Sequence, residues 1–425
     1  MTDMTTLAQA DPVVAALIAK DVQRQRSNIQ LIASENFVSY AMMEASGSVL
    51  ANKYFEGYPG RRYYEGCQVV DEIENLAIER AKDVFGAEHA NVQAHSGSQA
   101  NMAAYLAVLE PGDTILGMAL DQGGHLTHGS HVNFSGILFN FVAYGLDPDT
   151  EQIDFENVRA IALETRPKMI VAGYSSYSQI IDWSEFRAIA DEVGAILLVD
   201  AAHIIGLIAG GVHPSPVPHA DIVTATTHKA LRGPRGGLIL CKAEYAKAID
   251  KAVFPTSQGG AINHQIAGKA LCFKQVASPE YAQYAAQIVS NASTLADTMT
   301  ARGVRVISGG TQNHMFMIDL RSIDEDLTGK VAATLLDDTG ITLNRNAIPF
   351  DPRSPFVTSG LRMGTAAVTT AGMKDPAMVT LGNVIVDILV NRDDDAALST
   401  ARATINALVT AFPSYPVDFP GYVGN

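Results

Sequence analysis

Short apolar runs alternate with amphipathic stretches between residues 91 and 242, and this alternation restricts the fold more than any other feature of the sequence. Each run is rich in β-branched or other apolar residues, is bounded by turn-forming residues and indicates a strand. The seven runs are NVQAH (91–95), DTILGMAL (113–120), LFNFVAYG (138–145), KMIVAGYS (168–175), ILLVDAAH (196–203), DIVTATT (221–227) and GGLILCK (236–242). Strands that alternate with helices predict an α/β fold with a mostly parallel sheet covered on both faces.

The C-terminal third has a different pattern, which is typical of a smaller α+β domain. A long helix is expected over 278–302, followed by strands over 304–309 and 314–320 and by a helix ending near Gly340. Further strands are expected around 341–344 and 360–363, and a helix over about 376–391.

The N-terminal residues indicate helices joined to a long loop. Asp11-Pro12 is typical of a helix start, and a helix is expected to about Arg26, with another over 41–51. Residues 52–66 are aromatic and glycine-rich without periodicity, which predicts a long loop. Loops of this length in compact domains usually have a functional role or are disordered, and this one is too aromatic for disorder. We therefore expect an N-terminal arm with helices (1–55), a large domain (56–277) and a small C-terminal domain (278–425).

Composition excludes several classes of function. The net charge of −15 argues against a nucleic-acid or anionic-membrane partner. The three cysteines form no CxxC pair, so no disulfide framework or zinc site is indicated. No basic stretch followed by an apolar core opens the chain, and the most apolar window, 194–211, carries Asp200 and His203 in its middle. We expect a cytoplasmic protein without a membrane span.

The first candidate for chemistry is Lys229, which lies between a predicted strand and the turn RGPRGG. Lysine is seldom fully buried without a partner, and a desolvated lysine has a depressed pKa and attacks carbonyl groups. One interpretation is therefore a lysine that forms a Schiff base. The other is an ordinary surface lysine on a turn, and this segment alone leaves both open.

Two further candidates follow predicted strands, where open α/β sheets bind their ligands. Ser96, Gly97 and Ser98 would place N–H and hydroxyl donors at a helix N-terminus, which suits a phosphate, although the same residues also form ordinary helix caps. Asp200 ends an apolar strand and needs a cationic partner such as a protonated pyridine nitrogen. A structural aspartate that accepts loop N–H groups is the alternative.

Histidine and arginine supply the remaining candidates. His125, His128 and His131 are spaced by three residues, but the preceding glycines and the absence of a carboxylate at motif spacing argue against a metal site. One of these rings is better suited to stack on a flat cofactor, or to be a hydrogen-bonded loop residue. Arg362, on a predicted strand, is expected to bind a carboxylate, either of a substrate or of a structural acid. Together these groups match what pyridoxal 5'-phosphate (PLP) and an amino acid require.

The sequence resembles the serine hydroxymethyltransferase family over nearly its whole length. The matching segments, in order, are LIASENF, NKYFEGYPGRRYYEG, HSGSQAN, GGHLTHGS, VDAAH, TTHKALRGPRGG and SPFVTSGLRMGT. The resemblance implies the fold of type I PLP enzymes, with 56–277 as the PLP-binding domain, and tetrahydrofolate as co-substrate. It also implies a homodimer whose active sites lie between subunits, with a tetramer as the other possible assembly.

The resemblance also implies roles for individual residues. For PLP it implies a covalent bond to Lys229 and contacts from Ser96, Gly97, Ser98, His125, Ser175, Asp200, His203 and His228, and from the partner subunit's Gly259 and Gly260. For catalysis it implies Lys229, Thr226, Tyr64, Glu56 as the acid/base group beside the substrate hydroxyl, and Tyr54 next to it from the neighbouring subunit. For the substrate carboxylate it implies Ser34, Tyr64 and Arg362, and for folate Leu120, Gly124, Leu126 and Asn346. No metal is implied.

Several positions depart from the family pattern. Ala230 follows the lysine where the family usually has Thr, Ile204-Ile205 replace smaller residues, and Phe350 and Ala366 replace a polar residue and a proline. Loss of two heavy atoms beside Lys229 is expected to make room for a group on the substrate Cα, and a methyl group is worth only about 1–3 kcal/mol of discrimination. We therefore favour 2-methylserine as substrate, giving D-alanine and 5,10-methylenetetrahydrofolate, as in one branch of the family.

Three alternatives remain at this stage. Neutral drift in an ordinary serine/glycine hydroxymethyltransferase would produce the same departures. A folate-independent 2-methylserine aldolase is disfavoured by the retained GGHLTHGS and Asn346. A non-catalytic protein of the PLP fold is disfavoured by the intact Lys229, Glu56 and Arg362.

Overall fold

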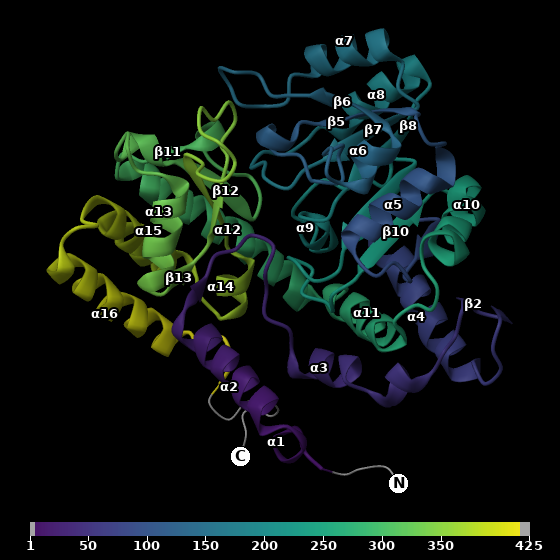
Figure 1. Cartoon of the computed structure of the whole chain (residues 1–425), viewed down its shortest axis with the longest axis horizontal. Coiled ribbons are helices and arrows are strands. Elements are labelled where there is room, and N and C mark those ends of the chain that lie inside the picture. The colour runs from purple at the N-terminus through teal and green to yellow at the C-terminus, as the bar shows by residue number, and fades with distance from the viewer. Residues whose placement is uncertain (1–4, 417–425) are drawn as a thin grey trace.

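A seven-stranded sheet forms the centre of the computed structural model, which describes residues 5–416. The strand order is β4 (His89–Asn91), β10 (Gly237–Cys241), β9 (Ile222–Thr226), β8 (Ile196–Asp200), β7 (Met169–Gly173), β5 (Thr114–Met118) and β6 (Asn140–Tyr144). Only β10 runs antiparallel to its neighbours, β4 and β9. The predicted α/β class and the predicted number of strands are confirmed. Figure 1 shows this sheet among the helices of the chain.

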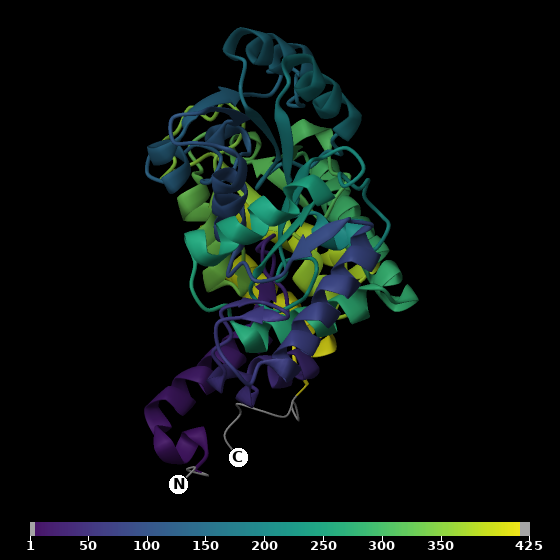
Figure 2. The ribbon, with the colours of Figure 1, turned by 90° about the vertical axis from the view of Figure 1, so that its right-hand side faces the viewer.

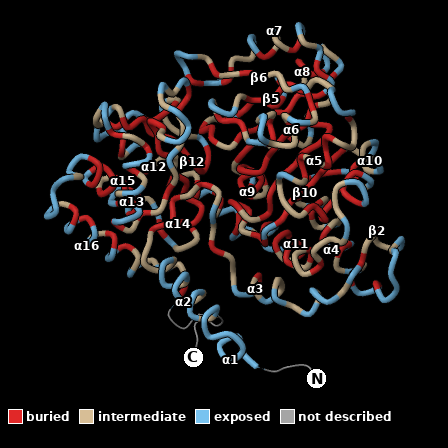
Figure 3. The backbone as a smooth tube through the Cα atoms, viewed as in Figure 1, coloured by how far each residue is buried: buried red, intermediate tan, exposed pale blue. Residues whose placement is uncertain are grey.

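Helices cover both faces of this sheet because successive strand residues point to opposite sides. In β8, Leu197 packs into one core and Leu198 into the other, and both are fully buried. The first core also receives α4 (Gln68–Phe85), α7 (Phe155–Thr165), α8 (Trp183–Val193), α9 (Ile205–Ala209) and α11 (Asn263–Val276). The second receives α5 (Gly97–Val108) and α10 (Ala246–Lys251), with α6 (Phe134–Leu138) packed beside them. Figure 3 shows this buried interior in red.

A four-stranded antiparallel sheet forms the centre of the C-terminal part. Its order is β11 (Arg305–Val306), β12 (Met315–Asp319), β15 (Gly360–Gly364) and β14 (Asn344–Asn346). The helices of this part are α12 (Pro279–Ala301), α13 (Gly329–Asp338), α14 (Ala366–Thr370), α15 (Asp375–Val390) and α16 (Asp395–Ala411). Helix α16 lies beyond the last helix that the sequence pattern indicated. Its buried residues, Leu398, Ala401, Ile405 and Leu408, follow one another at steps of three and four, so the sequence did carry a helical apolar pattern here.

The N-terminal segment joins both cores. Helices α1 (Leu7–Ala10) and α2 (Pro12–Ser27) bury no residue within the chain, and they extend away from the rest of it (Figure 2). Strand β1 (Ile29–Gln30) then pairs in parallel with β13 (Ile341–Thr342) of the C-terminal part. After it, α3 (Tyr40–Ser46) leads back toward the large sheet, where Phe55 is buried. The expected domain boundaries stay predictions.

The long loop expected over 52–66 contains a small hairpin formed by β2 (Gly57–Tyr58) and β3 (Arg61–Arg62). Arg62 anchors it, because its buried guanidinium donates to Asp71 and Glu74 at 2.7 and 2.6 Å. Within the described residues, no helix combines the length and apolarity needed to cross a membrane.

Candidate active site

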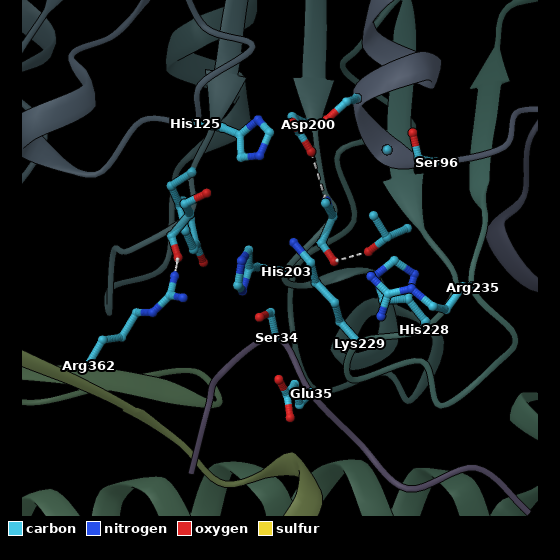
Figure 4. A pocket seen from close by; sticks show the side chains of 16 residues that line it. Ser34, Glu35, Ser96, His125, Asp200, His203, His228, Lys229, Arg235 and Arg362 are labelled. Atoms are coloured by element: carbon cyan, nitrogen blue, oxygen red, sulfur yellow. Dashed lines mark hydrogen bonds between the residues drawn. The ribbon is translucent and has the colours of Figure 1, made fainter. Parts of the chain in front are cut away.

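A cavity of about 430 Å³ opens at the C-terminal ends of the parallel strands, the position expected for a ligand site in an open α/β sheet. Of the residues expected in the site, it is lined by Ser34, Ser96, Gly97, Ser98, His125, Ser175, Asp200, His203, Thr226, His228, Lys229 and Arg362 (Figure 4). Glu35, Tyr174, Ala202 and Arg235 also line it and were not expected. The chain thus brings together residues as distant in sequence as Ser34 and Arg362.

Lys229 is a buried amine, so the interpretation as a surface lysine is wrong. It follows β9, and only 9% of its surface is exposed. Burial lowers its pKa to about 8, although the negative charge of Asp200 opposes the shift. The turn that carries Lys229 is held in place because the Asn36 side chain donates to the Lys229 carbonyl at 3.1 Å. An amine in this environment is a suitable nucleophile for a carbonyl carbon.

Asp200 ends β8, and both oxygens of its carboxylate accept hydrogen bonds. Oδ1 accepts from the backbone N–H of Ala202 at 3.0 Å, and Oδ2 accepts from Asn101 Nδ2 at 2.8 Å and from His128 Nε2 at 3.2 Å. Burial alone would raise the pKa of Asp200, but the hydrogen bonds from His128 and Asn101 hold it well below its usual range. Asp200 therefore faces the cavity as a carboxylate that can pair with a protonated pyridine nitrogen.

The geometry supports the prediction that the turn formed by Ser96, Gly97 and Ser98 binds a phosphate. Ser96 caps α5, accepting from the N–H of Gln99 at 3.2 Å, and a Cβ on Gly97 would lie 2.6 Å from Thr226 Cγ2. Only glycine thus lets this turn approach the end of β9. Nearby, the buried Nδ1 of His228 has no hydrogen-bond partner among residues 5–416, and Arg235 presents a guanidinium to the same cavity. An unpaired ring nitrogen, a cation and a helix N-terminus together fit a phosphate.

Arg235 was missed because it lies within RGPRGG, where glycine and proline indicated only a turn. The available signal was a second cation six residues after Lys229, close enough in sequence to reach the same ligand.

Arg362 reaches the cavity from β15 of the C-terminal part. Burial lowers its pKa to about 10. Its guanidinium donates to the Ser175 carbonyl at 2.6 Å and to Asn344 Oδ1 at 3.1 Å, and no carboxylate among the described residues pairs with it. The structural interpretation, an ion pair with a protein acid, is therefore wrong. A buried guanidinium that lacks a carboxylate and lines a cavity is suited to bind the carboxylate of a ligand.

Two of the cavity histidines, His125 and His203, lie across the cavity from Ser96 (Figure 4). Burial lowers the pKa of His125 to about 4, so this ring is neutral near pH 7 and is suited to stacking. His203 is buried and stacks on His314, with ring centroids 5.5 Å apart. His128 points to Asp200, a role that its sequence position did not indicate. His131 is exposed, and no group of side chains in residues 5–416 could hold a metal ion.

The model of one protein family, described as serine hydroxymethyltransferase, matches residues 7–385. The chain belongs to the serine hydroxymethyltransferase family. It is accordingly a PLP-dependent transferase of the serine/glycine type, with tetrahydrofolate as co-substrate. Its type I PLP fold agrees with the observed seven-stranded sheet.

Some of the residues that the family resemblance implies do not line the cavity of their own chain. Glu56, Tyr54 and Tyr64 form a separate group with Gly259 and Gly260. The Tyr54 and Tyr64 rings lie 5.3 Å apart, and a Cβ on Gly259 would lie 3.4 Å from Glu56 Oε1. A Cβ on Gly260 would lie 3.3 Å from the Tyr54 ring. We call these five residues the arm cluster.

The residues that the family would use for folate also lie outside the cavity lining. Leu120 and Leu126 are each about half exposed, which is unusual for leucine and leaves apolar surface available. Asn346 contacts Ser176 at 3.4 Å, one residue beyond the cavity-lining Ser175. Gly124 is buried in a tight turn, where a Cβ would lie 2.2 Å from the Met118 carbonyl oxygen.

The expectation that Ala230 itself widens the hydroxymethyltransferase's substrate pocket is wrong. Ala230 is 1% exposed and belongs to the core, and it is not part of the cavity lining. Its backbone packs on α9, where a Cβ on Gly206 would lie 2.4 Å from the Ala230 carbonyl carbon. Any influence of Ala230 on the substrate therefore acts through the backbone that carries Lys229.

Proposed function

We propose that this hydroxymethyltransferase acts preferentially on 2-methylserine, transferring its hydroxymethyl carbon to tetrahydrofolate and releasing D-alanine. The packing around Lys229 supports this proposal. Ile204, Ile205 and Ala230 depart from the usual family residues, and Gly206, which follows Ile205 on α9, packs on the backbone of residues 230–231. Larger side chains on one side and a smaller one on the other would move the backbone of Lys229, and with it the space left for a substituent on Cα.

Each group of the cavity has a role in this reaction. When bound, PLP supplies the electron sink that stabilises negative charge at the substrate Cα. Lys229 would hold its carbonyl carbon, and the Ser96 turn, His228 and Arg235 would hold its phosphate. Asp200 would keep the proton on the pyridine nitrogen, while the ring of His125 covers one face. Arg362 and Ser34 would bind the substrate carboxylate, and burial of Lys229, which lowers its pKa, would keep its amine reactive.

The arm cluster supports a homodimer with shared sites. Because Glu56, Tyr54 and Tyr64 do not line the cavity of their own chain, we propose that they complete the cavity of the partner, together with Gly259 and Gly260. Glu56 would then exchange a proton with the substrate hydroxyl as the Cα–Cβ bond breaks or forms. The exposed apolar side chains of α2, including Val13 and Leu17, would be covered in such a dimer.

Folate would bind beside the cavity mouth. Leu120 and Leu126 would contact its apolar rings, and Asn346 and the Gly124 turn would supply polar contacts. The one-carbon acceptor would then lie near Ser175 and Arg362, because Asn346 contacts Ser176 and Arg362 donates to the Ser175 carbonyl.

One assay tests the substrate proposal. The purified protein, loaded with PLP and supplied with tetrahydrofolate, is offered L-serine and 2-methyl-L-serine separately, and kcat/KM is measured for each. A larger kcat/KM for 2-methyl-L-serine is expected, and a larger value for L-serine would overturn the preference. The same two reactions without tetrahydrofolate distinguish the transferase from an aldolase, which would release formaldehyde at an unchanged rate.

The Lys229 assignment is tested separately. Lys229→Ala should lose the visible absorbance of covalently bound PLP, whereas Lys247→Ala, on α10, should keep it. A Lys229→Ala protein that still forms a covalent adduct on borohydride reduction would contradict the assignment.

A further inference from the structure

A single buried amide connects two residues that face the proposed pyridine ring. Asn101 lies on α5 and is 1% exposed. One hydrogen of its Nδ2 is donated to Asp200 Oδ2 at 2.8 Å, and the other to Thr127 Oγ1 at 2.7 Å. Its Oδ1 accepts from Thr224 Oγ1 at 2.5 Å. Both donors and the acceptor of the amide are thus used, and its orientation is determined by its partners.

The Thr127 branch ends at the ring of His125. Because Thr127 Oγ1 accepts from Asn101, its own hydrogen is free for His125 Nδ1, which lies 2.7 Å away. The backbone N–H of Thr127 donates to the same ring nitrogen at 3.2 Å. His125 Nδ1 is therefore an acceptor, the proton is on Nε2, and the plane of the ring is fixed. The Tyr105 hydroxyl also stabilises Thr127, because it donates to the Thr127 carbonyl at 3.0 Å.

The Asp200 branch is closed by His128. The backbone N–H of His125 donates to His128 Nδ1 at 3.2 Å, so the proton of this ring is on Nε2. His128 Nε2 then donates to Asp200 Oδ2, the oxygen that Asn101 also contacts. The two branches consequently form one closed network, in which movement of the His125 segment is transmitted to Asp200 through His128.

Helix α5 connects this network to the proposed phosphate site. Its N-cap, Ser96, belongs to the proposed phosphate site, and Asn101 lies five residues further along the same helix. One rigid element thus carries the phosphate contacts and also orients the groups at the face and at the nitrogen of the ring.

We infer that Asn101 is a positioning residue that couples Asp200 to His125 and holds both in register with the Ser96 turn. The inference rests on the proposed roles of Asp200 and His125 toward PLP. Asn101 does not line the cavity, so its effect on the cofactor is transmitted through these two residues. If it served only to satisfy buried polar groups, its loss would lower stability without changing how the cofactor is held.

Asn101→Asp is the main test, because it keeps the shape of the side chain and removes both N–H donors. Asn291→Asp is the matched control. Asn291 is also fully buried and uses both Nδ2 hydrogens, toward Thr369 Oγ1 and the Met373 carbonyl, but it lies on α12 and does not line the cavity. Three quantities are measured for each protein: the Kd of PLP for the cofactor-free protein, the visible circular dichroism of the holoenzyme, and the pH midpoint of its visible absorbance.

Asn101→Asp is expected to raise the Kd of PLP about 10- to 100-fold, to reduce the visible dichroism and to shift the pH midpoint, since hydrogen bonds to a charged group are lost. Asn291→Asp should alter thermal stability alone. Wild-type values of all three quantities in Asn101→Asp would overturn the inference. If that variant fails to fold, Thr224→Val, which only frees the amide to turn, should give the same changes at smaller amplitude, and unchanged values there would overturn the inference equally.

Two further variants separate this inference from the proposed function. Asp200→Asn and His125→Ala should each perturb the visible spectrum if the cofactor site is correctly assigned. Wild-type spectra in both would refute the assignment itself. Perturbed spectra in these two, with an unperturbed Asn101→Asp holoenzyme, would refute the coupling alone.

Discussion

At the scale of single residues, Arg362 distinguishes a ligand contact from a structural one. Its guanidinium donates only to the neutral Ser175 carbonyl and Asn344 amide among the described residues, so its charge is uncompensated by any acid of the chain. A bound carboxylate would supply that compensation in a bidentate geometry that lysine cannot reproduce. The residue is thus specialised for the ligand and not for the stability of β15.

The first prediction concerns this arginine. Arg362→Lys should raise the KM of the amino-acid substrate about 10- to 100-fold, because a bidentate charge-assisted contact is replaced by a single point charge. Steady-state kinetics with varied amino acid measures the change. Arg345→Lys, an exposed position on the neighbouring β14, is the matched control and should leave KM unchanged. An unchanged KM in Arg362→Lys would argue for another carboxylate-binding residue.

A second prediction concerns the buried histidines. Burial lowers the pKa of His314 to about 3 from an ordinary value of 6.5. The unfolded chain therefore binds a proton near pH 5 that the folded chain does not. The stability that the neutral ring provides is complete above about pH 6.5 and is lost as the pH falls toward 3. From this residue alone, the free energy of unfolding should drop by about 2 kcal/mol between pH 7.5 and 5.

Urea unfolding of the cofactor-free protein at several pH values checks this. His314→Gln should have a lower free energy of unfolding at pH 7.5 but a shallower decline toward pH 5. His131→Gln, which removes an exposed histidine, should retain the wild-type slope. Parallel pH profiles for wild type and His314→Gln would show that His314 does not titrate as expected.

Single residues also show what the sequence could not reveal. Lys229, Asp200 and Arg362 were identifiable because a charged residue within an apolar strand, or just after one, is easily recognised in a sequence. Asn101 and His128 were not, since each is an ordinary polar residue until the fold brings it within 3.2 Å of Asp200. Ala230 was over-interpreted for the same reason: adjacency to Lys229 in sequence does not place a side chain in the same cavity.

At the scale of elements, strand order and register explain why the site forms where it does. Strands β7, β8 and β9 run side by side in parallel, so their C-terminal residues, from Gly173 to Thr226, reach one edge together. Their apolar runs were clear in the sequence because both faces are buried. Helix α16 was overlooked, although its core residues Leu398, Ala401, Ile405 and Leu408 have helical spacing. Pairing of β1 with β13 could not be foreseen, since a two-residue strand has no periodicity.

A buried lysine links two of these elements. Lys269 of α11 is 2% exposed, and its ammonium donates to the carbonyls of Val92, Ala94 and Gly237 at 2.5, 3.1 and 2.8 Å. Three acceptors match the three hydrogens of an ammonium group. These three hydrogen bonds, which we call the Lys269 clamp, connect the segment that follows β4, just before the Ser96 turn, to the start of β10.

The third prediction follows from this clamp. Lys269→Met fills a similar volume but leaves three buried carbonyls without a donor, and should lower the free energy of unfolding by about 3 kcal/mol or more. Because Ala94 precedes the Ser96 turn by two residues, PLP affinity should fall as well. Lys274→Met, on the exposed face of the same helix, is the matched control for denaturant unfolding. Equal stability of the two variants would mean that water replaces the ammonium.

At the scale of the whole molecule, the cavity and the arm cluster lie in one chain but do not meet there as a complete site. Lys229 and Arg362 line the cavity, whereas Glu56 and Tyr54 contact Gly259 and Gly260 outside its lining. A chain that carries both halves of a site without joining them is suited to a symmetric dimer, in which each copy supplies one half to the other. Residue patterns alone could not assign any of these residues to one subunit's cavity or the other's; only the family resemblance implied that Tyr54, Gly259 and Gly260 come from the neighbouring subunit.

The last prediction tests this arrangement by mixing inactive subunits. Lys229→Ala and Glu56→Gln homodimers should both be inactive. In a mixed dimer, one site combines an intact Lys229 from one subunit with an intact Glu56 from the other, while the second site carries both defects. After unfolding and refolding an equal mixture, about a quarter of wild-type activity should return, since half of the dimers are mixed and each has one intact site.

A second pair provides the control. Lys229 and Arg362 both line the cavity of their own chain, so a mixed dimer of Lys229→Ala and Arg362→Lys has one defect in each site and should stay at the level of its parents. Recovery in the first pair and none in the second would place Glu56 across the interface. Equal behaviour of the two pairs would instead require Glu56 to reach the cavity of its own chain, through a rearrangement of the loop formed by residues 52–66.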